Sequence, residues 1–443
     1  RMFVWCAAMA SSAEAQDLSG LISLLVDTGT PRTWTEYNPA GNVCGNGTQF
    51  RFYVHENDPG DPDNVLFYFE GGGACWTYDG CAGLSGVLGA ANPNGISPNY
   101  MTGLQQEYAS PLVNGADPGL PGRSRNDLFT KDWNVVFVPY CTGDVHVGNS
   151  TQTYTDPATG ASLTYHHNGY ANTQAVIQWV DNRWPSMGDL LVSGYSAGGT
   201  GTSANYYFIR SALADNMAAT GGRGYYLNDS GPLFPAPNSG SNSRALHDTI
   251  TTAWALGSVF ANIPASLKTP GNPNGFDLDD YGTLNRAVAT QYPNDQFAYT
   301  AFSMDFNYSR FSYERFLANP TQAEILADWQ EDQADLVTLL DTLPNFSYHL
   351  PWERPILDSH TSTTVTFIGS HACDQMEKKR YWWEYLQFPW SQTYKCYSEF
   401  LPMETFLDRW YGGGVSRVVE PENGYNDEDP GMQLVKALVD AAL

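Results

Sequence analysis

The sequence predicts an α/β fold with a mostly parallel central sheet, helices on both faces and inserted cap segments. Short apolar runs at 65–69, 134–140 and 190–193 are typical of buried parallel strands. Helix-compatible segments lie between or after these runs, for example at 168–184 and 202–217. Strands that alternate with helices along a chain favour a single α/β sheet.

The remaining elements extend this pattern over most of the 443 residues. Further strands are predicted at 50–54, 224–227, 297–304 and 363–370, and further helices at 245–260, 321–343 and 432–443. No linker is long enough to split the chain, so we expect residues 16–443 to form one domain. Within it, 235–293 and 306–350 are predicted to be cap insertions over the site.

The first fifteen residues have the composition of a targeting segment. An apolar stretch of small residues leads to an A-x-A pattern at Ala13–Ala15. This is typical of the second half of a signal peptide, so we exclude 1–15 from the fold and expect a secreted protein. No later stretch is long and apolar enough to span a bilayer.

The charge balance restricts the partners. Asp and Glu number 47 against 22 Lys and Arg, and the formal net charge is −25. Nucleic acids and anionic membrane surfaces require clustered basic residues, so both are excluded as partners. We expect a monomer that acts on a small-molecule or polysaccharide substrate.

Six cysteines follow Cys6, and an even number in an exported chain predicts disulfides. Cys75 and Cys81 flank a short turn beside a glycine loop, and we expect them to pair. Cys373 and Cys396 are the next candidate pair. The cysteine spacings match no zinc pattern, so neither a metal site nor an organic cofactor is predicted.

The strongest chemical signal is the G-x-S-x-G-G turn at Gly194–Gly199, between a predicted strand and a predicted helix. This is the context in which a serine, here Ser196, is raised on a strained turn as a nucleophile. Gly194 and Gly198 keep side chains out of the tight crossing. The start of the helix adds positive potential where negative charge develops.

A triple glycine, Gly71–Gly73, follows the buried run 65–69 directly. In α/β-hydrolases an H-G-G-G-type loop at this place supplies amides to the oxyanion hole, and here Glu70 stands in the position of the histidine. The predicted donors are therefore the amides of Gly72, Gly73 and Ala197, the last because it follows the nucleophile directly.

A serine nucleophile needs a histidine base and a carboxylate that orients the histidine. Asp305 follows the strand after the cap and is favoured as the acid, with Asp229 as the alternative or as a support for loop amides. His371 follows the last predicted strand and is favoured as the base, with His360 next. The order Ser, Asp, His is that of α/β-hydrolases.

Four motifs resemble those of pectin acetylesterases and the related Notum carboxylesterases: FEGGGACW at 69–76, YCTGD at 140–144, GYSAGG at 194–199 and NDSG at 228–231. The similarity is clear over about 40–240. It implies an α/β-hydrolase fold, a catalytic aspartate at Asp305 in SMDF and a histidine in a serine- and cysteine-containing loop similar to GSHAC at 369–373.

Residues and resemblance together predict a secreted serine carboxylesterase that hydrolyses short-chain, O-acetyl-type esters through an acyl-enzyme on Ser196. One alternative is a catalytically silent carbohydrate-binding or surface protein, since 14% of the residues are aromatic and could stack on sugars. Another is a serine peptidase on the same fold. Turnover of an acetate ester that depends on Ser196 would distinguish the esterase from the catalytically silent protein.

Overall fold

The computed structural model describes residues 32–57, 63–102, 109–117, 125–354, 356–373, 376–379, 393–396 and 400–422. The predicted targeting segment 1–15 and the predicted helix 432–443 lie outside these residues.

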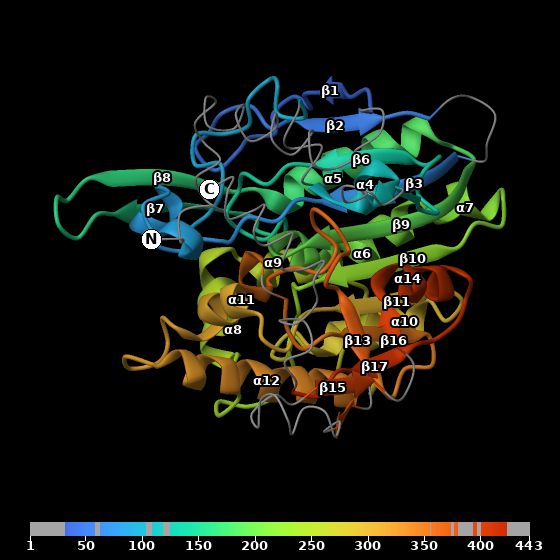
Figure 1. Ribbon diagram of the computed structural model, residues 1–443. Coiled ribbons are helices and arrows are strands. Elements are labelled where there is room, and N and C mark those ends of the chain that lie inside the picture. The colour runs from blue at the N-terminus through green and yellow to red at the C-terminus, as the bar shows by residue number, and fades with distance from the viewer. Residues whose placement is uncertain are drawn as a thin grey trace.

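A nine-stranded sheet runs through the molecule in the order β1-β2-β6-β3-β9-β10-β11-β12-β17 (Figure 1). The first three strands pair antiparallel, and every pair from β6 to β17 is parallel. The strands are β1 (Thr35–Tyr37), β2 (Phe52–His55), β3 (Asp63–Phe69), β6 (Asn134–Val138), β9 (Met187–Tyr195), β10 (Gly224–Asp229), β11 (Gln296–Thr300), β12 (Phe346–Leu350) and β17 (Arg417–Val419).

The central strands are buried because both of their faces are covered. In β10, Tyr226 packs against Tyr206 of α6 (Ala197–Ala212), and its neighbour Tyr225 packs against Trp410 of α14 (Met403–Tyr411). Adjacent residues of a strand point to opposite faces. The two helices therefore lie on opposite sides of the sheet, as an α/β-hydrolase fold requires.

The other helices of eight or more residues fill the connections between strands. They are α5 (Gly169–Arg183), α8 (Arg244–Ala253), α10 (Thr283–Gln291), α11 (Phe306–Tyr313) and α12 (Gln322–Leu340). A two-stranded hairpin, β7 (Ser150–Thr155) with β8 (Ser162–His167), projects from one end of the body (Figure 1). No helix among the described residues has the length and apolar character needed to cross a membrane.

One strand prediction is wrong. Residues 363–370 form an irregular buried loop. The strand that follows β11 in the sheet is instead β12, which lies inside the segment 306–350 that was predicted to be a cap insertion. Half of 363–370 is Ser or Thr. The strand propensity of the threonines is outweighed here, because Asp229, Asp117 and Arg354 bind amides and carbonyls of this segment.

Two disulfides join described cysteines, Cys44 to Cys141 and Cys75 to Cys81. The second confirms the pairing predicted from the sequence. Cys373 is also disulfide-bonded, while the side chain of Cys396, its predicted partner, lies outside the described residues.

Candidate active site

The nucleophile turn has the strained backbone that the motif predicts. Ser196 lies between β9 and α6 with φ 55° and ψ −124°, a conformation that non-glycine residues rarely adopt. Its amide donates a 2.8 Å hydrogen bond to the carbonyl of Asp229. A Cβ on Gly194 would lie 2.5 Å from the carbonyl oxygen of Gly198, so the crossing of strand and helix tolerates only glycine there.

The glycine loop lies against this turn. A Cβ on Gly71 would lie 2.5 Å from the carbonyl oxygen of Tyr195. Gly72 and Gly73 follow with φ of 146° and 64°, and both are partly exposed. Ala197 is the first residue of α6. The three amides predicted as oxyanion donors thus come from one loop and one helix start that pack together.

Glu70 holds the glycine loop from within the core. Glu70 is 4% exposed, and its carboxylate accepts hydrogen bonds from the amide of Tyr140 at 2.9 Å and the hydroxyl of Tyr100 at 2.7 Å. Burial raises the pKa of Glu70 to about 7, although both hydrogen bonds oppose that rise. The Glu70 carbonyl accepts a 2.8 Å bond from Nε2 of buried His146. The glycine motif marks the position of Glu70, but it does not predict that Glu70 anchors the loop to Tyr100, Tyr140 and His146.

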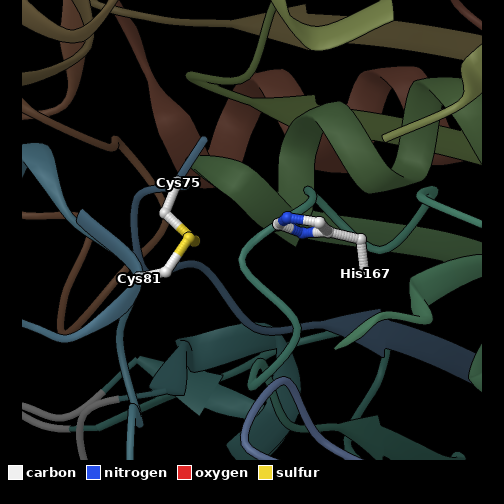
Figure 2. A group of neighbouring side chains, drawn as sticks. All are labelled: Cys75, Cys81 and His167. Carbon is white, nitrogen blue, oxygen red and sulfur yellow. A yellow bond between two sulfur atoms is a disulfide. The ribbon is translucent and has the colours of Figure 1, made fainter. Parts of the chain in front are cut away.

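The Cys75–Cys81 disulfide braces the far end of the same loop (Figure 2). The amide of Cys75 donates to the carbonyl of Gly143 at 2.8 Å, and its carbonyl accepts from Nε1 of Trp254 at 2.9 Å. His167 lies next to the disulfide, and its ligand nitrogen and the two sulfurs are within 4.8 Å of one another. Because the sulfurs are bonded to each other, they are not thiolates that could bind a metal with His167.

The carboxylate of Asp305 pairs with a histidine. Asp305 follows β11, caps α11 by accepting a 2.9 Å bond from the amide of Tyr308, and is fully buried. Nδ1 of His360 lies 2.9 and 3.0 Å from its two oxygens. Burial by itself would lower the pKa of His360, but the charge and hydrogen bond of Asp305 outweigh it and hold that pKa above its usual value.

The sequence favoured His371 as the partner of Asp305, but the residue that bonds to Asp305 in the structure is His360. His371 begins the short strand β13 (His371–Cys373), opposite Pro402 of β16 (Phe400–Pro402). The prediction depended on a strand at 363–370, which would have placed His371 at a strand end. Without that strand, position along the chain no longer favours His371 over His360.

Asp229 connects the nucleophile turn to the loop that carries His360. Its buried carboxylate accepts bonds from the amides of Ser362 at 2.8 Å and Thr363 at 2.7 Å, and from both hydroxyls. Its carbonyl accepts from Ser196, as described above. These are the bonds expected of a residue that supports loop amides, the alternative role considered for Asp229.

Arg354 holds the same loop from its carbonyl side. Arg354 is 1% exposed, and its guanidinium donates to the carbonyls of Thr361 at 2.7 Å and Thr366 at 3.1 Å. Local sequence carries no signal for this role, because the arginine lies outside every motif. The loop is thus fixed by the carboxyl group of Asp229 at its amides and by the guanidinium of Arg354 at its carbonyls.

Comparison with known proteins identifies the family of the chain. The family model described as Pectinacetylesterase matches residues 32–274. No curated protein matches the chain. A solved structure of the Wnt deacylase Notum from Drosophila is similar at 17% identity and a TM-score of 0.44, covering 72% of this chain and 84% of that one. The family model matches more than half of the sequence, and the chain therefore belongs to the pectinacetylesterase family of ester hydrolases.

Proposed function

We propose that this esterase is a serine carboxylesterase in which Ser196 is the nucleophile, His360 the general base and Asp305 the residue that orients the base. The observation that carries the proposal is the bond between Nδ1 of His360 and Asp305, in a fold whose serine turn is strained. A carboxylate on Nδ1 fixes the tautomer in which Nε2 is free to take a proton. His360 replaces His371 in this assignment.

In the first step, Oγ of Ser196 bonds to the ester carbonyl carbon while His360 takes the hydroxyl proton. The amides of Gly72, Gly73 and Ala197 donate to the oxyanion that forms. The carbon–oxygen ester bond then breaks, and His360 returns its proton to the departing alcohol. Water attacks the acyl-enzyme in the same way and releases the carboxylic acid. Asp305 stabilises the imidazolium that forms in each half.

For the substrate we propose short-chain, O-acetyl-type esters. The family supports this, and so does an aromatic cluster immediately after the glycine loop. The ring of Trp76 lies 5.1 Å from that of Phe311 and 6.2 Å from that of Phe316, centroid to centroid. Trp76 is three residues after Gly73 in the chain, and we infer that these bulky rings limit the room for a long acyl chain.

Export of the protein is part of the proposal. Disulfides persist in oxidising compartments and are rare in the cytosol. The Cys44–Cys141 and Cys75–Cys81 bonds fit an enzyme that acts outside the cytosol on an ester of a small molecule or a polysaccharide.

Hydrolysis of nitrophenyl esters from acetate to decanoate, together with labelling by a fluorophosphonate, tests the mechanism. Ser196→Ala should abolish both turnover and labelling. The matched control is Ser193→Ala, three residues earlier in β9, which should retain both. Equal, slow turnover by wild type and Ser196→Ala would instead indicate a catalytically silent protein. A steady rise of kcat/KM through octanoate would overturn only the short-chain preference.

A further inference from the structure

Tyr308, in the first turn of α11, is hydrogen-bonded both to Asp305 and to Thr200, which lies in the helix that begins after Ser196. Its amide donates to Oδ1 of Asp305 at 2.9 Å. Its hydroxyl lies 2.8 Å from Oγ1 of Thr200, which is in the first turn of α6. The amide of Thr200 in turn donates to the carbonyl of Ser196 at 3.1 Å.

The surroundings of Tyr308 hold it in place. Its ring centroid lies 5.7 Å from that of Trp329 on α12 and 6.4 Å from that of His360. Burial raises the pKa of the phenol to about 12, with the Thr200 hydroxyl opposing the rise and the Asp305 charge adding to it. The hydroxyl therefore remains protonated, and able to bond to Thr200, over the pH range in which an esterase would be assayed.

This connection joins elements that are not neighbours in the sheet. Ser196 follows β9 and Asp305 follows β11, and β10 lies between them. Small errors in the relative placement of a nucleophile and its base are costly, since a displacement of about 1 Å can lower the rate about 100-fold. Hydrogen bonds from Ser196 through Thr200 and Tyr308 to Asp305 would limit such displacements.

We propose that Tyr308 is a positioning residue that keeps the Asp305–His360 pair in place relative to Ser196, through the bond of its hydroxyl to Thr200. The inference rests on the proposed function, because it assigns Tyr308 a part in the same reaction. Tyr308 touches Asp305 through its backbone, so removing the hydroxyl alone leaves the cap of α11 unchanged.

Tyr308→Phe tests the inference. We expect kcat for nitrophenyl acetate to fall roughly tenfold, with KM changed less than about twofold, because orientation and not substrate binding is impaired. The matched control is Tyr313→Phe on the same helix, whose buried hydroxyl donates to Asp332 at 2.8 Å. It should lower Tm and leave kcat within about twofold of wild type.

A double-mutant cycle with Thr200→Val identifies the bond. If Tyr308 acts through Thr200, the double variant should be no slower than the slower single variant. Wild-type kcat in Tyr308→Phe, or an equal loss in Tyr313→Phe, would overturn the inference. In those cases Ser196-dependent labelling would persist, and the serine mechanism would stand. Absence of labelling in wild type would overturn the mechanism and this inference with it.

Discussion

The two sides of the proposed active site are built in different ways. The oxyanion side, 70–76, follows β3 directly, and its glycines have the backbone freedom that a tight loop needs. The histidine side, 356–370, is an irregular loop with five non-glycine residues at positive φ: Leu357, Asp358, Ser359, Thr361 and Val365. These conformations are unfavourable for most side chains, at roughly 1–3 kcal/mol each.

The difference shows how each side keeps its shape. A short disulfide braces the oxyanion loop, and hydrogen bonds from Tyr100, Tyr140 and His146 fix Glu70 at its start. The histidine loop is instead held along its own backbone by two buried side chains, Asp229 at its amides and Arg354 at its carbonyls. Substitutions on the histidine side should therefore have the larger effects on both catalysis and stability.

The largest expected effect concerns the histidines. His360→Ala should lower kcat for nitrophenyl acetate by about 10⁴-fold or more, because the proposed base is lost. His371→Ala should leave kcat within about threefold and act mainly on Tm. Kinetics of both purified variants, with circular dichroism as a folding control, make the comparison. The reverse pattern would return the role of base to His371.

The second-largest effect is expected for Asp305→Asn. Its kcat should fall by about 10⁴-fold, because the carboxylate that fixes the tautomer of His360 is gone. The variant should also alter the pH profile. His360 acts as a base when neutral, so its raised pKa places the acid limb of wild-type kcat/KM above the usual histidine value of about 6.5. Without the carboxylate, burial should move the limb of the residual activity to lower pH. An unmoved limb would contradict the pairing.

Asp229→Asn should destabilise the protein by about 4 kcal/mol, because one of its two acceptor oxygens becomes an NH2 group that faces buried N–H and O–H donors. Its kcat should fall less than that of Asp305→Asn. Asp248→Asn, an exposed site on α8, serves as the control and should change the free energy of unfolding by less than about 0.5 kcal/mol. Urea titration measures both. A transfer of the catalytic loss to Asp229 would make it the acid.

The smallest effect is expected on the oxyanion side, at Glu70. Its pKa is about 7 in the folded protein against an ordinary value of 4.5, so the folded state favours the protonated form. Stability from this group is complete below pH 4.5 and is lost as the pH rises to 7, by no more than about 3 kcal/mol. Glu70→Gln should lack this pH dependence. Thermal unfolding of both proteins from pH 4.5 to 8 checks it, and parallel curves would refute it.

Several parts of this protein could be predicted from short stretches of sequence. The buried strands β3, β6 and β9, the turn around Ser196 and the Cys75–Cys81 bond all follow from residues close together in the chain. Their determinants are local: apolar runs, glycines where a Cβ would collide, and a short loop between two cysteines. Local rules therefore suffice for the fold class and for the backbone of the turn at Ser196.

The histidine side was decided by tertiary structure. Residues 363–370 resemble a strand in isolation, but in the fold the carboxyl group of Asp229 binds the amides of Ser362 and Thr363, 133 and 134 residues later in the chain. The pairing of Asp305 with His360 likewise joins residues 55 positions apart. A buried polar group takes whichever partner the packed fold brings to it, and no local pattern encodes that choice.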